Sequence, residues 1–469
     1  MKRIITVFVF ALAFVLLVSN GANVFAAGKS IEAFKCNNYS GTNDCQKMIS
    51  EITGYDSAYS SYYKSSSFSQ SDLTGKSRCI KYWSGHGNNS GQLWGDNCPT
   101  ISVMGINNFK WSGSNLEFIF FAACRQLDGS GLNPRAKYAN AMIGNNAVRV
   151  ICGYHEDAPA AGPDVTVAYN FMQKAKTGES VKSSWIQANQ MVSNYYYCVL
   201  THSGNVQFSR FPGFPGLTYT RPGASSTTIL RFSSANPTGT LQPLTSGAPS
   251  LEALLQSVEI PNFSLRATDV DFYVNSNIKT TVLKIGNYLT TQNNEIGDKE
   301  VCISEEEAVS ITKKWLKDAY SGVTWNDFND GELLVIPIVM AEVDLDGNVE
   351  NEREVVIAYD ISLISMFDGI PVYDDKYCTI VDDTGVISSA ISHRTYKVVK
   401  NENNKGVLNK ETIEKKLVSS GVDLNGIEKC SLAFMDEDGD DIFDPVLSVK
   451  TSDCRTTRLN LITGKISVC

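Results

Sequence analysis

A cysteine and a histidine each stand just beyond an apolar run in this sequence. Cys124 follows the run "FIFFAA", and His86 follows "IKYWS" and stands between two glycines. A thiol becomes an effective nucleophile at neutral pH only when a neighbouring base or imidazolium favours its thiolate form. A histidine side chain can supply that partner. If the fold brings them together, these two residues could attack a carbonyl carbon.

The segments in front of these residues have the composition of buried β-strands. Residues 78–83, 116–122 and 147–152 are short apolar runs, rich in aromatic or β-branched side chains. The chain between the first two is long enough for a crossover, so these strands can be parallel neighbours. Ligands of open α/β sheets bind outside the carboxyl ends of the strands. We therefore expect Cys124 as nucleophile and His86 as general acid/base at one sheet edge.

Glycines on both sides of His86 would let the backbone turn sharply and let a substrate carbonyl approach. The backbone N–H groups of Gly87 and Cys124 are then candidates for an oxyanion hole, since donors aimed at a developing negative charge stabilise the transition state.

Helix signals alternate with these strands. Asn43 can cap a helix that ends near Gly54, and Pro134 stands where a second helix would begin. Residues 164–175 and 180–191 have helical periodicity. Strands alternating with helices favour an α/β fold, a mainly parallel sheet with helices on both faces.

The two stretches "YWSGHG" and "FFAACRQL" resemble the caspase-like (clan CD) cysteine peptidases, nearest to secreted bacterial proteins with an SGHG box and to CHAT-like proteases. Their pattern is a strand, His-Gly, a second strand, then Ala-Cys. Ala122 and Gln126 depart from the caspase version of the motif. The resemblance implies a caspase-like peptidase domain over residues 27–204. It also implies cleavage of protein or peptide substrates through a His-Cys dyad, without a cofactor or metal.

The loop after the third strand carries His155, Glu156 and Asp157. Several members of this clan use an acidic residue in such a loop to bind a basic side chain of the substrate, so the resemblance makes these residues a candidate specificity pocket. A solvated polar loop is the competing interpretation.

The residues leave other functions open. Cys124 could be a core cysteine or half of a disulfide, with His86 a turn residue. The protein would then be a non-catalytic secreted or cell-surface binding protein on a caspase-like scaffold. An inactive homologue, with the fold kept and the chemistry lost, is a further alternative.

The first 26 residues have a basic start, an apolar run and small residues at their end, as a secretory signal peptide does. A retained membrane anchor is the competing interpretation. No later stretch is apolar and long enough to span a bilayer, so we expect an exported protein without a membrane span after processing. The net charge of −9 and the absence of a basic cluster argue against a nucleic-acid partner.

Composition changes after residue 204. Residues 205–250 are rich in Pro, Gly, Ser and Thr and are expected to form a linker or irregular surface structure, in which residues 227–232 are a candidate short strand. Residues 251–469 are expected to form a separate α+β region, whose first clear helix has a capping box from Ser304 to Glu307. "ISEEEAVSITKKWL" resembles PepSY-type modules. Such modules often inhibit secreted peptidases, so intramolecular inhibition by this region is expected.

The acidic stretch at residues 435–445 does not match a calcium-binding EF-hand loop. With Gly439 in the required position, the first ligand would be Phe434. We expect a turn with solvated carboxylates there and no specific metal site.

Overall fold

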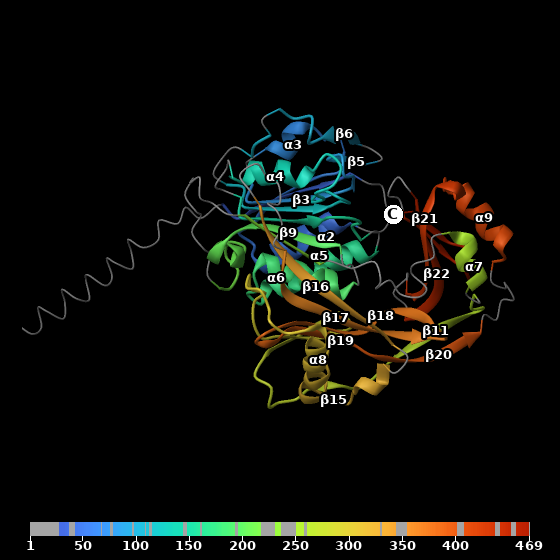
Figure 1. Cartoon of the computed structure of the whole chain (residues 1–469). Helices are drawn as coiled ribbons and strands as arrows, with labels where there is room; N and C mark the ends of the chain where they lie inside the picture. The colour runs from blue at the N-terminus through green and yellow to red at the C-terminus, as the bar shows by residue number, and fades with distance from the viewer. Residues whose placement is uncertain are drawn as a thin grey trace, which may run out of the picture.

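Figure 1 shows the protein as a computed structural model. It describes residues 28–36, 43–66, 68–75, 78–95, 98–107, 109–111, 115–143, 148–159, 162–192, 196–216, 230–235, 250–257, 260–328, 331–343, 354–400, 408–436, 441–451 and 456–468. The predicted signal peptide, most of the predicted linker and the centre of the acidic stretch, residues 437–440, lie outside these ranges.

The predicted parallel strands are present in the N-terminal part. They are β1 (Ser30–Lys35), β2 (Ser60–Lys64), β3 (Ile80–Ser84), β7 (Phe118–Ala122) and β8 (Val150–Tyr154). They pair in parallel in the order β2-β1-β3-β7-β8. In β1, β3, β7 and β8 buried side chains point to both faces, as expected for a parallel sheet that is covered on both sides, whereas the edge strand β2 is largely exposed.

Helices cover both faces of this parallel sheet (Figure 1). One face packs against α2 (Asp44–Tyr55), α5 (Gly162–Lys176) and α6 (Val181–Met191), and the other packs against α3 (Gln70–Thr74) and α4 (Pro134–Ile143). Local capping fixes where several of them begin. The Asn43 side chain accepts the Gln46 N–H at 2.9 Å, and the Ser180 hydroxyl accepts the Ser183 N–H at 3.2 Å.

Beyond β8 the sheet becomes antiparallel and continues into the C-terminal region. Strand β9 (Tyr197–His202) pairs with β8, and β10 (Leu230–Ala235) lies between β9 and β16 (Glu332–Val343). The sheet then runs through β17 (Val355–Phe367), β18 (Ile370–Asp382) and β19 (Gly385–Ser392). The fold is thus a mixed α/β fold. The expected separate C-terminal region instead shares a sheet with the N-terminal part, because β10 satisfies the free edges of both.

The outer part of this sheet carries one further helix and a hairpin. Strands β13 (Thr281–Ile285) and β14 (Tyr288–Gln292) form the hairpin, and β14 pairs with β19. Helix α8 (Glu305–Ala319) packs on β17, β18 and β19. The predicted capping box is confirmed, since the Ser304 side chain and the Glu307 side chain each accept the other residue's N–H.

Elements that precede β13 and elements that follow β19 together form a second, smaller β-structure with its own core. Its elements are α7 (Leu251–Ser257), β11 (Phe263–Asp269), β20 (Arg394–Lys400), α9 (Lys410–Ser419), β21 (Ile427–Met435), β22 (Ile442–Thr451), β23 (Thr456–Asn460) and β24 (Ile466–Val468). We call this the C-terminal subdomain. In Figure 1, β21 and β22 stand beside the N-terminal part rather than extending away from it.

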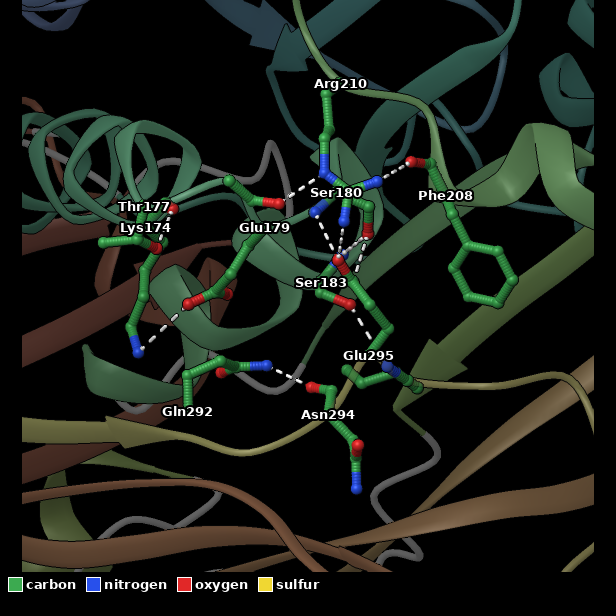
Figure 2. A network of polar contacts seen from close by, with 12 residues as sticks. Lys174, Thr177, Glu179, Ser180, Ser183, Phe208, Arg210, Gln292, Asn294 and Glu295 are labelled. Atoms are coloured by element: carbon green, nitrogen blue, oxygen red, sulfur yellow. Dashed lines mark hydrogen bonds and ion pairs between the residues drawn. The ribbon is translucent and has the colours of Figure 1, made fainter. Parts of the chain in front are cut away.

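A partly buried polar network joins the C-terminal region to the turn between α5 and α6 (Figure 2). The Glu295 carboxylate accepts the Ser180 N–H at 2.9 Å and the Ser180 hydroxyl at 2.7 Å, and it pairs with Arg210 at 2.8 Å. In the same turn, burial raises the pKa of Glu179 to about 7, although Lys174 lies 3.6 Å away and opposes the shift. These contacts give the two parts a specific relative orientation.

Candidate functional site

The strands that precede His86 and Cys124 are parallel neighbours in register. Ser84, the last residue of β3, lies opposite Ala122, the last residue of β7. His86 and Cys124 each follow two residues later, so both emerge at the same edge of the sheet. The Gly85 N–H donates to the Ala122 carbonyl at 3.2 Å and continues the pairing beyond the strands. The predicted juxtaposition of the two segments is therefore present in the fold.

Gly87 brings the two segments into direct contact. A Cβ atom at residue 87 would overlap the carbonyl oxygen of Cys124 and stand 2.6 Å from Nε2 of Gln126. Only a residue without a side chain permits this approach. The backbone after His86 therefore lies against the backbone at Cys124, as a shared site requires.

Gln126 holds both turns in place, a role that sequence reasoning missed. Its side chain is fully buried, and Nε2 donates to the carbonyls of Gln92 at 3.1 Å and Asn88 at 3.4 Å. Its Oε1 accepts the Tyr138 hydroxyl at 2.9 Å. The carboxamide also donates to the Cys124 carbonyl at 3.4 Å. The signal in the sequence is a polar residue two positions after Cys124, where the caspase motif has another residue.

The turn after β7 has a fixed and unusual backbone. Arg125 has a φ of +57°, a conformation that side-chain-bearing residues seldom adopt. Its N–H donates to the Glu156 carbonyl at 2.7 Å, and the Leu127 N–H donates to the Tyr154 carbonyl at 3.0 Å. These bonds tie the Cys124 turn to the end of β8, so neighbouring structure maintains the backbone strain.

His86 lies in a small antiparallel sheet that projects from this edge. Its strands are β4 (His86–Gly87), β5 (Gln92–Gly95) and β6 (Cys98–Ser102). The half-buried imidazole stacks on Trp94, with ring centres 5.6 Å apart. The Cys98 thiol contacts the Cys36 carbonyl at 3.8 Å at the base of this sheet. The ring of His86 is thus held on one side while its backbone faces the Cys124 turn.

The Cys124 thiol differs from the other cysteines of the parallel sheet. It is half-buried, and its Sγ accepts the N–H of Ala158 at 3.4 Å. A hydrogen bond donated to sulfur favours the thiolate over the thiol. By contrast, burial raises the pKa of the Cys152 and Cys198 thiols well above the usual range, which leaves them unreactive.

The candidate specificity residues after β8 are held by different partners. The imidazole Nε2 of His155 lies 3.1 Å from the Ala235 carbonyl of β10, and burial lowers the pKa of this ring. The carboxylate of Asp157 pairs with Lys450 of β22 at 2.5 Å. The His155 side chain is therefore directed toward β10. The Asp157 side chain is already engaged by Lys450 of the C-terminal subdomain.

A cleft of about 240 Å³ lies between the loop after β8 and the C-terminal subdomain. Asp157 and Ala158 line one side of it, and Lys429, Lys450 and Arg458 line the other. Since the Ala158 N–H contacts the Cys124 sulfur, this cleft begins beside the candidate nucleophile. We call it the interdomain cleft. Sequence reasoning could not find it, because its two sides are far apart along the chain.

Residues 36–208 match the family model described as a domain of unknown function, DUF6345. The matched segment contains His86, Cys124 and the loop after β8, and it ends in the short 3-10 helix Gly204–Phe208 that follows β9. No curated protein matches the chain.

No described helix has the length and apolar character needed to cross a membrane. No group of three or more His, Cys, Asp or Glu side chains within the described ranges is arranged to hold a metal ion.

Proposed function

We propose that the protein is a cysteine peptidase that hydrolyses peptide bonds through Cys124 and His86. The observation that carries the proposal is the registered parallel pairing of β3 and β7, with Gly87 packed against the Cys124 backbone. A catalytic dyad requires two side chains from separate segments at one point, and parallel strand ends supply that arrangement.

In the proposed reaction, the Cys124 thiolate attacks the carbonyl carbon of the peptide bond and forms a C–S bond. His86 donates a proton to the amide nitrogen as the C–N bond breaks, which releases the amine and leaves a thioester. A water molecule then attacks the thioester, His86 accepts its proton, and the acid leaves as the thiolate is restored. The backbone N–H groups of Gly87 and Cys124 would stabilise the negative oxygen of each tetrahedral intermediate.

The caspase-like assignment is part of this proposal. It is supported by strand-His-Gly followed by strand-Ala-Cys on parallel neighbours, with helices on both faces of the sheet. Export is likewise proposed, from the signal-like residues 1–26. From these features together we propose a secreted enzyme that acts on extracellular proteins or peptides.

Inhibition by the C-terminal region is proposed in a changed form. Lys450 reaches Asp157, next to the residue that contacts the Cys124 sulfur, so the C-terminal subdomain lies at the rim of the site. The stretch that resembles PepSY modules, "ISEEEAVSITKKWL", instead lies in α8, which packs on β17, β18 and β19 and is not part of this subdomain. However, β10 joins both parts in one sheet, so relief of inhibition would need a local movement of the subdomain rather than release of a tether.

The alternative is a non-catalytic binding protein that uses the interdomain cleft. The shared sheet and the polar network around Glu295 favour a rigid binding surface between the two parts. This alternative requires no reactive thiol, so labelling of Cys124 separates the two functions.

The test is labelling of the full mature chain with a thiol-reactive peptide warhead, followed by mass spectrometry. We expect modification at Cys124, loss of labelling in Cys124→Ala, and a fall in peptide hydrolysis of about a thousandfold or more. Cys302 is exposed and serves as the internal control for simple accessibility. Equal labelling of Cys302 and Cys124, or wild-type hydrolysis by Cys124→Ala, would refute the proposal.

Cys152→Ala supplies a matched control for loss of a cysteine. Cys152 lies in β8 with no exposed surface, so its replacement should lower stability by about 1 kcal/mol and leave Cys124 labelling intact. His86→Ala should lower the labelling rate at Cys124 without unfolding the chain.

A further inference from the structure

Basic side chains from three successive strands meet in the interdomain cleft. Lys429 lies in β21, Lys450 in β22 and Arg458 in β23, and all three line the cleft. Asp157 is the acidic residue that lines the described cleft. The lining is therefore positively charged, whereas the whole chain has a net charge of −9. A local excess of positive charge in an acidic protein indicates a site for an anion.

The strand register brings two of these cations into direct opposition. Lys429 of β21 pairs with Lys450 of β22 across the antiparallel ladder. Like charges directly opposite each other destabilise a sheet. Consistent with this, burial and the nearby Lys450 both lower the pKa of Lys429, while Asp157 and Glu156 oppose the shift. Asp157 offsets this repulsion in part through its ion pair with Lys450, and a bound anion would offset it further.

Arg458 adds an independent observation. It is half-buried, and among the described residues no acceptor reaches its Nε atom. A buried donor without an acceptor is destabilising, because it has lost its hydrogen bonds to water. Its position in the lining of the cleft means that an acidic group bound there would be close to the guanidinium. Guanidinium groups bind carboxylates well, because their planar fork of donors matches the two oxygens.

The size and position of the cleft identify the kind of anion. A volume of about 240 Å³ lies below the usual range for a small-molecule or cofactor pocket, about 300–1,000 Å³, and suits one or two side chains. Ala158 lines the cleft and donates its N–H to the Cys124 sulfur. A peptide that places an acidic side chain in the cleft would therefore pass beside the thiol.

We propose that the interdomain cleft binds acidic side chains of a peptide, and that substrates carry Asp or Glu near the cleaved bond. The identification of this peptide as a substrate rests on the proposed function. The proposal differs from the sequence-based expectation that Asp157 selects a basic side chain. Lys450 already neutralises Asp157, so the remaining charge in the cleft is positive.

Binding can be measured without catalysis by using the full mature chain with Cys124→Ala. We would record fluorescence anisotropy with a labelled peptide that contains Glu residues, and with the same peptide in which Gln replaces each Glu. We expect the Glu peptide to bind at least about tenfold more tightly, as a charge-assisted hydrogen bond predicts, with weaker binding as salt is added. Equal binding of the two peptides would overturn the proposal.

Substitutions in the cleft test whether its basic side chains bind the Glu peptide. Lys429→Gln combined with Arg458→Gln should weaken binding of the Glu peptide by about tenfold or more. Lys429→Arg should retain the binding, since it keeps the charge. Lys284→Gln is the matched control, because Lys284 is exposed on β13 and does not line the cleft. Circular dichroism and thermal unfolding would verify that each variant is folded. An equal loss of binding in Lys284→Gln would overturn the assignment to the cleft.

The outcomes distinguish this proposal from the proposed function. Selective binding of the Glu peptide without Cys124-dependent hydrolysis would support acidic side-chain binding in the interdomain cleft and refute the peptidase function. Cys124-dependent hydrolysis with no preference for acidic peptides would support the peptidase function and refute acidic side-chain binding in the cleft. An oligonucleotide that bound as tightly as the Glu peptide would assign the cleft to nucleic acid and overturn the peptide assignment.

Discussion

At the scale of single residues, the site depends on the absence of a side chain at position 87. The backbone of Gly87 occupies the space that any Cβ would need, against the carbonyl of Cys124. The buried carboxamide of Gln126 then bonds to both turns and keeps them at this distance. Contact between His86 and Cys124 segments is therefore enforced by packing as well as by strand register.

Gly87→Ala should displace the Cys124 turn. We expect a loss of about 1–3 kcal/mol in the free energy of unfolding, because an added methyl group overpacks a filled space, together with slower warhead labelling of Cys124. Urea unfolding and labelling rates would measure the two effects. Gly54→Ala is the control: nothing lies within 4 Å of the added Cβ, and alanine in a helix should be neutral or stabilising. Unchanged labelling and stability in Gly87→Ala would contradict the packing argument.

His202 should make folding sensitive to acid. This residue of β9 is 1% exposed, its Nε2 lies 3.0 Å from the Val148 carbonyl, and burial lowers its pKa to about 4. The unfolded chain binds the proton near pH 6.5 and the folded chain only near pH 4. Stability is therefore lost as pH falls through this interval, by about 3 kcal/mol in total.

The measurement is urea unfolding of wild type and His202→Gln at about pH 7.5 and about pH 4. Relative to the variant, wild type should lose about 3 kcal/mol between these conditions. The comparison with the variant is necessary because Glu179 and Asp360, whose pKa values burial raises to about 7 and about 6, act in the opposite sense. A constant difference between the two proteins would show that His202 is not buried as a neutral ring.

At the scale of elements, β10 connects the two halves of the molecule. It pairs along one side with β9 and along the other with β16, although it lies in a stretch of low-complexity composition. Both neighbouring strands would otherwise present a free edge. The junction therefore depends on backbone hydrogen bonds of a single short strand.

Ser233→Pro should break this junction. Ser233 is buried in the middle of β10, opposite Val199 and Met340, and proline cannot donate to the ladder. We expect a loss of about 3 kcal/mol or more. Hydrogen exchange should increase in both β9 and β16. Ser233→Ala keeps the N–H group and controls for the hydroxyl. Faster exchange confined to β10 would show that pairing with β10 does not stabilise β9 and β16.

At the scale of the whole molecule, one hydrophobic core includes side chains from both parts. Phe120 and Trp185 of the N-terminal part belong to the same buried cluster as Ile336, Ile338 and Ile380 of the C-terminal sheet. The polar side chain of Gln190 also crosses the boundary, donating to Asp360 at 2.6 Å. A fragment that ended after β9 would lack the C-terminal side of this core and would leave Gln190 without its Asp360 partner.

We therefore expect the fragment of residues 28–204 to be aggregation-prone or unfolded, and the full chain to unfold in one cooperative transition of this shared core. Near-ultraviolet circular dichroism of the fragment and calorimetry of the full chain would measure these properties. A tethered inhibitor would give the opposite result, a folded fragment that is more active than the full chain.

The sequence by itself determined the local elements and the placement of the candidate dyad. Residues 78–83, 116–122 and 147–152 correspond to β3, β7 and β8, and the caps at Asn43 and Ser304 are where the helices begin. Such features depend on neighbouring residues, so periodicity and capping rules find them. The position of His86 and Cys124 follows in turn, because parallel strands end at a common edge.

Only the tertiary structure decided how distant segments meet. The low-complexity stretch around β10 contains no periodicity that predicts its two partner strands. Nothing in the local sequence around Asp157 or Lys450 indicates that these two residues form an ion pair. Gln126 is a central residue because the folded chain places carbonyls of two separate turns around its side chain. These contacts depend on which surfaces bury each other. That choice is made by the packing of the whole chain rather than by any local pattern.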